Sequence, residues 1–145
     1  MKLAHAVNLR TFIKPEDDYE ADKQAFLGLI PFSLEDEKVP LQETDAKGFN
    51  ERQIVILEVQ LDKQRHVKAF LEKLQAELSG AQKQQLLEQD DRLDDECDFY
   101  LRFRKKDLPR LVLTDKGDCV HVRLSIAAFP KKRENAREAV KEIFK

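Results

Sequence analysis

Residues 98–126 read DFYLRFRKKDLPRLVLTDKGDCVHVRLSI, and two runs in this segment alternate between apolar and polar side chains. The first run covers residues 99–104 and the second covers residues 120–126, with a further strand starting at residues 111–113. Successive side chains of a strand point to opposite faces of a sheet. A turn around Gly117 precedes the second run. The segment therefore predicts antiparallel strands that have one apolar and one polar face.

The rest of the chain supplies two more strands and four helices. Alternation predicts strands at residues 3–14 and 54–61, and helical spacing of apolar residues predicts helices at residues 16–30, 62–78, 79–87 and 130–144. Asp62 is a candidate N-cap, Ser79 with Gln82 resembles a capping box, and Pro130 suits the first turn of the last helix. Residues 33–53 are too long for an ordinary connection, so they form either a functional loop or an edge strand around residues 38–41.

The order of these elements predicts the fold class. Strands and helices alternate irregularly and end in a hairpin-rich segment, so we expect an α+β fold with a mostly antiparallel sheet and helices packed on one face. A length of 145 residues is common for one domain, which we expect to span residues 1–145.

Charge is distributed unevenly along the chain. Residues 99–145 hold 13 Lys and Arg against six Asp and Glu, a formal charge of +7, whereas the other residues carry −9. Such asymmetry suggests an anionic partner for the last third of the chain. No segment has the length and apolarity of a membrane span or a signal peptide, so we expect a cytoplasmic protein with no membrane partner and reduced Cys97 and Cys119.

The polar face of the predicted sheet is the first candidate site. Tyr100, Arg102, Arg104, His121 and Arg123 share one phase of the strand alternation. Guanidinium groups beside an aromatic ring suit phosphate contact and base stacking, as in proteins that bind single-stranded RNA. The alternative is a solvated face whose arginines pair with Glu58 or other acids.

A second candidate is the run Lys131-Lys132-Arg133 at the start of the last helix. Cations at a helix N-terminus oppose the helix dipole, so helix stability does not explain them. Phosphate binding does, because free backbone N–H groups and basic side chains meet there. Lys105, Lys106 and Arg110 extend the same basic surface. The alternative is a solubilising surface run.

Signatures of catalysis are weak. The histidines His5, His66 and His121 are isolated, and no glycine-rich phosphate loop or nucleophile motif is present. The acidic residues 90–98 do not have calcium-loop spacing. We therefore expect no enzymatic activity, no cofactor and no metal site.

Several segments together resemble a known family. They are Tyr100-Leu101-Arg102-Phe103, the turn at Gly117-Asp118, and Ala128-Phe129-Pro130-Lys131-Lys132-Arg133-Glu134-Asn135-Ala136, supported by the strand Asn8-Leu9-Arg10-Thr11-Phe12. The chain resembles a small archaeal family of predicted RNA-binding, exosome-associated proteins. That resemblance implies an α+β fold similar to the ribosomal protein that holds the smallest ribosomal RNA, and an accessory role in RNA processing or degradation.

The leading hypothesis is a non-enzymatic RNA-binding protein. It assigns phosphate contact or stacking to eight residues, namely Tyr100, Arg102, Arg104, Lys105, Arg123, Lys131, Lys132 and Arg133. The alternative is an adaptor subunit of an RNA-processing complex that has no direct RNA contact, and a small nuclease is a third hypothesis. Because the two oppositely charged parts could pair between copies, we expect a monomer or a weak homodimer.

Overall fold

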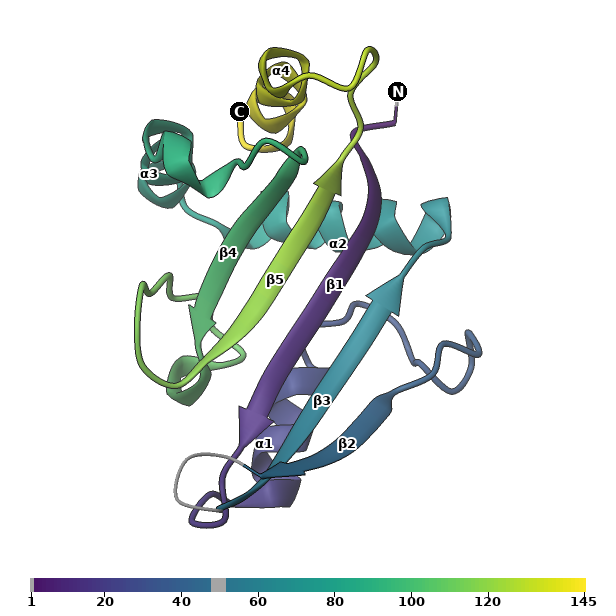
Figure 1. Cartoon of the computed structure of the whole chain (residues 1–145), viewed down its shortest axis with the longest axis vertical. Coiled ribbons are helices and arrows are strands. Elements are labelled where there is room, and N and C mark those ends of the chain that lie inside the picture. Colours follow the sequence, from purple (N-terminus) through teal and green to yellow (C-terminus); the bar gives the residue numbers. More distant parts are fainter. Residues whose placement is uncertain (1, 48–51) are drawn as a thin grey trace. The chain divides into compact units, whose positions relative to one another are not determined.

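Five strands pair in the order β2-β3-β1-β5-β4 in a computed structural model that describes residues 2–47 and 52–145 (Figure 1). Neighbouring strands are antiparallel, so the chain is α+β as the sequence predicts. The strands are β1 (Ala4–Ile13), β2 (Gln42–Lys47), β3 (Gln53–Leu61), β4 (Asp98–Arg104) and β5 (Cys119–Ile126), and the helices are α1 (Tyr19–Leu27), α2 (Gln64–Glu77), α3 (Gly80–Glu88) and α4 (Arg133–Ile143). None of the described helices is long and apolar enough to cross a membrane.

Contacts divide the chain into two compact units. Unit 1 comprises Met1–Val7, Leu61–Leu101 and Arg123–Lys145, and unit 2 comprises Asn8–Gln60 and Arg102–Val122. The sequence predicts one domain over residues 1–145.

The core of unit 1 joins strand β4 to helices α2 and α4. Phe99 is buried on β4, and its ring centroid lies 5.4 Å from that of Phe144, the C-cap residue of α4. The Gln75 side chain of α2 donates to the Ile143 carbonyl at 3.1 Å. Ser79 and Gln82 form the predicted capping box at the start of α3. These contacts leave the Tyr100 side of β4 open, with 41% of Tyr100 exposed.

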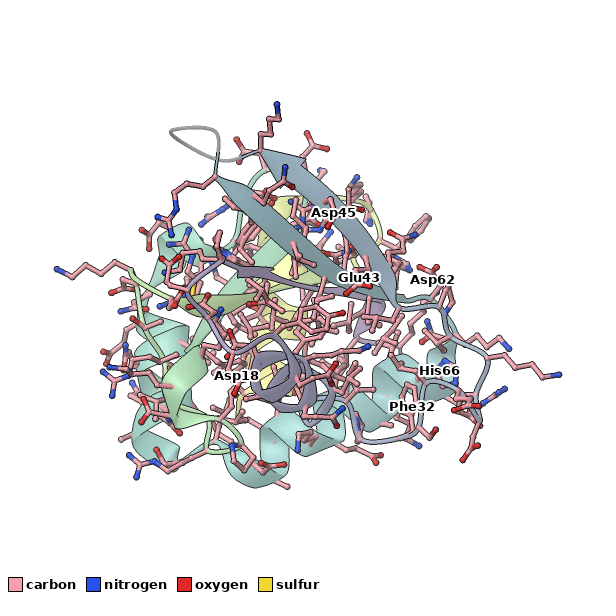
Figure 2. The ribbon with its side chains drawn as sticks, turned by 90° about the horizontal axis from the view of Figure 1, so that it is seen from below. Asp18, Phe32, Glu43, Asp45, Asp62 and His66 are labelled. Atoms are coloured by element: carbon pink, nitrogen blue, oxygen red, sulfur yellow. The ribbon has the colours of Figure 1, made fainter. Side chains whose placement is uncertain are left out.

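The core of unit 2 forms around Phe26 of α1, which is fully buried. The Asp18 carboxylate accepts from the Ala21 N–H at the start of this helix, and Tyr19 donates to Glu43 of β2. Asp18 and Glu43 are labelled in Figure 2. Strand β2 runs antiparallel to β3, with Gln42 opposite Glu58. The alternation predicted for β1 and β3 is present, since Leu9, Leu57 and Val59 are buried.

Two predicted strands differ in the structure. The edge strand covers residues 42–47 rather than 38–41, since Pro40 cannot donate to a strand ladder and the pairing with β3 begins only after it. The strand predicted at residues 111–113 is reduced to one isolated bridge, Phe103 to Leu113. Hydrogen bonds still link this segment to β4, from the Arg104 N–H to Val112 and from the Thr114 N–H to Arg102.

Three helix starts also differ from prediction. Helix α1 begins at Tyr19 rather than at residue 16, because the Asp18 side chain caps it there. The N-cap of α2 is Lys63 and not Asp62. Helix α4 begins at Arg133, and Pro130 lies ahead of it because Lys132 has extended backbone angles. The basic run is therefore divided between a loop and a helix.

Candidate nucleic-acid interface

Four side chains form a cluster on the polar sheet face of unit 2. Arg10 and Phe12 come from β1, Arg102 from β4 and His121 from β5, each next in sequence to buried strand residues. Phe12 is 37% exposed, and its ring meets His121 edge to face with centroids 5.8 Å apart and an interplanar angle of 84°. We call this group the sheet cluster.

The sheet cluster is electropositive. Burial first, and then the charges of Arg102 and Arg10, lower the pKa of His121 below its ordinary value of 6.5. Arg10 pairs with Glu58 at 3.3 Å but keeps 47% of its side chain exposed, and Arg102 donates to the Asp115 carbonyl at 2.9 Å. Two guanidinium groups beside a neutral imidazole and an accessible ring suit an anion that carries a flat aromatic group.

The lowered pKa of His121 predicts a pH-dependent stability. The unfolded chain binds a proton at His121 near pH 6.5 more readily than the folded chain does, so the contribution of this histidine to stability is complete above 6.5 and is lost as the pH falls toward the folded pKa. We expect His121→Gln to reduce the loss of unfolding free energy between pH 7.5 and 5.5, as measured by urea denaturation. The matched variant His5→Gln changes an exposed histidine, and an equal effect from it would contradict the prediction.

Arg104 and Lys105 do not join the sheet cluster. The Arg104 guanidinium is bonded to Asp107, three residues along the chain, and holds the pKa of that carboxyl below its usual range. The Lys105 side chain is only 5% exposed, and its ammonium donates to the Phe12 carbonyl at 2.7 Å and lies 3.1 Å from Asp22. The structure therefore buries Lys105 within unit 2, where neighbouring carboxylates already engage its ammonium.

Tyr100 and Arg123 belong to unit 1. The Tyr100 hydroxyl donates to the Asp94 carboxylate at 3.1 Å, and burial and this acid raise the pKa of the phenol. The Arg123 charge acts on Tyr100 in the opposite direction, so the two side chains are electrostatic neighbours. The Tyr100 ring is therefore held at its hydroxyl and lies near Arg123, which is exposed as the strand alternation predicts.

The basic run at residues 131–133 has two different environments. Arg133 donates to the Leu93 carbonyl at 3.0 Å and to the Asp90 carbonyl at 2.6 Å, and it pairs with the Asp90 carboxylate. Lys131 lies 3.8 Å from Glu96, with both side chains largely exposed. No ion pair of Lys132 is present among residues 2–47 and 52–145. Lys131 and Lys132 are thus accessible to a ligand, whereas Arg133 ties α4 to the segment before β4.

The acidic segment before β4 is explained by these internal contacts. Asp90 accepts from Arg133 and Arg137, and the Arg133 guanidinium holds the pKa of Asp90 below its usual range. Asp94 accepts from the backbone N–H groups of Glu96 and Asp98 at 2.9 Å. Within the described chain, no group of three His, Cys, Asp or Glu side chains is placed to hold a metal ion.

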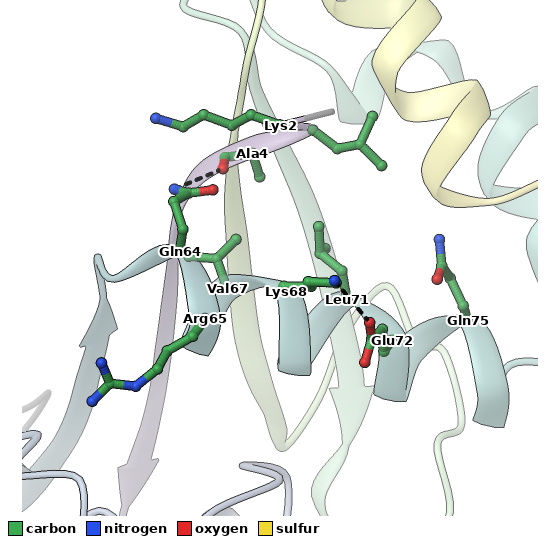
Figure 3. A pocket seen from close by; sticks show the side chains of 10 residues that line it. Lys2, Ala4, Gln64, Arg65, Val67, Lys68, Leu71, Glu72 and Gln75 are labelled. Atoms are coloured by element: carbon green, nitrogen blue, oxygen red, sulfur yellow. Dashed lines mark hydrogen bonds and ion pairs between the residues drawn. The ribbon is translucent and has the colours of Figure 1, made fainter.

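A shallow groove in unit 1 is a less suitable binding site. It has a volume of about 450 Å³ and lies along α2 beside the start of β1 (Figure 3). Its polar side chains bond to neighbours: Gln64 donates to the Ala4 carbonyl at 3.4 Å, and Lys68 lies 4.0 Å from Glu72. Because these polar groups already bond to one another within the lining of the groove, the basic sheet residues and loop lysines are the stronger candidates.

Sequence reasoning did not select three residues that the structure adds. Arg10 and Phe12 lie on the polar face of β1, and their alternation with buried Leu9 could have identified them. Phe129 lies two residues before Lys131 and is 97% exposed. From sequence alone a phenylalanine is ordinarily assigned to the core, because most phenylalanine side chains are buried.

Comparison with known proteins identifies the family. Residues 6–126 match a family described as RNA binding. The chain belongs to this RNA-binding family. An RNA-binding protein of the archaeon Pyrococcus abyssi is 30% identical over 142 residues, which cover 96% of this chain and 92% of the relative. These findings confirm the expected archaeal RNA-binding family.

Solved structures share the fold of this family member. A protein from Archaeglobus fulgidus has 28% identity and a TM-score of 0.84, covering 98% of this chain and 99% of its own. A protein from Methanothermobacter thermautotrophicus has 24% identity and a TM-score of 0.82, covering 99% of this chain and 100% of its own. The second likeness bears on the fold alone.

Proposed function

We propose that this protein binds RNA directly and without catalysis, as an accessory factor in RNA processing or degradation. The observation that carries the proposal is that, in each unit, exposed guanidinium groups lie near accessible aromatic rings, in a chain of an RNA-binding family. Arg10 and Arg102 of unit 2, and Arg123 of unit 1, contact phosphates. Phe12 and Tyr100 offer ring surfaces to bases.

Lys131 and Lys132 supply a further phosphate contact in unit 1. Both lie before the first turn of α4, whose N-cap has no side-chain hydrogen bond. Arg133 does not take part, because its guanidinium is engaged with Leu93 and Asp90. The proposed RNA-binding set therefore differs from the sequence hypothesis in leaving out Arg104, Lys105 and Arg133 and in adding Arg10 and Phe12. The association with an exosome-type complex remains part of the proposal and rests on the family resemblance.

Fluorescence anisotropy with labelled RNA over a range of salt concentrations tests this function. We expect affinity to fall with salt at a log-log slope near −0.7 for each neutralised phosphate of a single strand. Lys131→Glu/Lys132→Glu should weaken binding about 10-fold at low salt and reduce the slope by about 1.4, because two phosphate contacts are lost.

A matched variant controls for net charge. Lys63→Glu/Lys68→Glu makes the same charge change at the start of α2, where Lys68 is 79% exposed at its side chain. This variant should bind RNA almost as the natural protein does. Equal weakening by both variants would show that RNA affinity depends on net charge and not on the position of Lys131 and Lys132. Absence of binding to single-stranded and structured RNA at low salt would instead favour the adaptor, with the basic residues facing an acidic protein.

A further inference from the structure

Phe129 is an aromatic side chain that the structure leaves almost fully exposed. It lies in the loop of residues 127–132 between β5 and α4 and is 97% exposed. Phenyl rings normally gain free energy from burial. Among the residues that the structure describes, the other exposed large hydrophobic side chains, Phe12 and Tyr100, are only 37% and 41% exposed. Phe129 therefore has no role in the core and is available to a ligand.

Hydrogen bonds fix the loop at both ends. The Ala127 N–H donates to the Leu3 carbonyl at 2.9 Å. At the other end, the Pro130 carbonyl accepts from the Lys132 N–H at 2.8 Å and from the Asn135 side chain at 2.9 Å. A ring held on an ordered loop loses less conformational entropy on binding than a ring on a mobile one. The loop is thus preorganised to present Phe129.

Two lysines follow the ring along the chain. Lys131 and Lys132 are two and three residues away, so at most about 11 Å of extended backbone separates their Cα atoms from that of Phe129. The Lys131 contact with Glu96 at 3.8 Å joins two largely exposed side chains, and such pairs contribute little free energy. Both ammonium groups can therefore reach the phosphates beside a group that stacks on the ring.

We infer that Phe129 stacks on an unpaired RNA base while Lys131 and Lys132 bind the neighbouring phosphates. This inference rests on the RNA-binding function proposed above and adds the class of RNA. Bases inside a duplex are covered on both faces by their neighbours, so only an unpaired or splayed base offers a face to the ring. Single strands and loops are the ligands of this site, and duplexes are not.

Three substitutions of Phe129 test the inference. The probes are a single-stranded oligouridylate carrying one central 2-aminopurine and a blunt RNA duplex of the same length. Phe129→Ala should weaken single-strand binding by about 5- to 100-fold, the range for losing one base stack, and should abolish quenching of the 2-aminopurine. Phe129→Leu should behave like alanine, and Phe129→Trp should retain binding and quenching. Duplex affinity should not change.

The outcomes separate this inference from the function on which it rests. If the natural protein binds no RNA, both fail. If it binds RNA and Lys131→Glu/Lys132→Glu weakens binding, but Phe129→Ala leaves affinity and fluorescence unchanged, the stacking assignment alone is overturned.

Retention of binding by Phe129→Leu would indicate an apolar contact and also overturn stacking. Loss of a dimer in Phe129→Ala, seen by light scattering, would assign the ring to a second copy. A thermal melt of each variant verifies the fold.

Discussion

Lys105→Met is expected to lower the free energy of unfolding by about 3 kcal/mol, because it removes a buried ammonium and leaves three partly exposed carboxylates without their counter-ion. The Lys105 ammonium lies 3.1 Å from Asp22, 3.7 Å from Asp17 and 3.8 Å from Asp118. It also donates to the Phe12 carbonyl at 2.7 Å. One side chain thus joins the end of β1, helix α1 and the turn before β5.

Water access to the acids limits the size of this effect. Their side chains are 17%, 22% and 42% exposed, so each carboxylate keeps part of its hydration when the lysine is removed. The expected loss is therefore at the lower end of the about 3–5 kcal/mol typical for breaking a buried ion pair.

Urea denaturation at neutral pH measures the loss, with Lys106→Met as the matched control. Lys106 is the exposed neighbour, and its replacement should change stability by less than about 0.5 kcal/mol. Equal stability of the Lys105 variant and the natural protein would show that the buried ammonium contributes nothing to the fold. If Lys105→Met keeps its stability but loses RNA affinity, Lys105 belongs to the interface after all.

The position of Lys105 shows which part of the structure the sequence could predict. Phe99, Leu101, Phe103 and Lys105 share one phase of the alternation, and all four are buried. Alternation alone therefore placed Lys105 on the inner face, and only its charge suggested exposure. Its partners lie at residues 17, 22 and 118, and no local pattern reveals contacts between positions so distant along the chain.

The basic run at residues 131–133 shows the same limit. The sequence predicts the positive charge of this run and its place at the start of the last helix, and Lys131 and Lys132 are exposed as expected. The role of Arg133 depends on carbonyl groups at residues 90 and 93, about 40 positions away, which composition cannot reveal. Phe129 was missed for a different reason: hydrophobicity predicts burial, and the loop that exposes this ring is set by backbone hydrogen bonds.

The variant Arg102→Glu/Arg123→Glu is expected to bind single-stranded RNA at least about 100-fold more weakly than the natural protein at low salt. A hydrogen bond to a charged partner contributes about 1.5–3 kcal/mol, so the loss of two corresponds to at least that factor. Arg102 comes from unit 2 and Arg123 from unit 1, and each is an exposed residue of its own strand, β4 or β5. Each glutamate also adds repulsion toward the phosphates.

Replacement by lysine separates charge from geometry in these contacts. Arg102→Lys/Arg123→Lys keeps the charge but removes the planar fork that binds two phosphate oxygens at once. We expect this variant to keep the salt dependence of the natural protein and to lose only part of its affinity, whereas the glutamate variant loses both. Anisotropy titrations at several salt concentrations measure both the affinity and its salt dependence.

The Lys63→Glu/Lys68→Glu protein again controls for net charge. Natural affinity in the glutamate variant would remove the strand arginines from the RNA contact and leave the loop of residues 127–132 as the binding site, because its ring and lysines do not depend on the strand face.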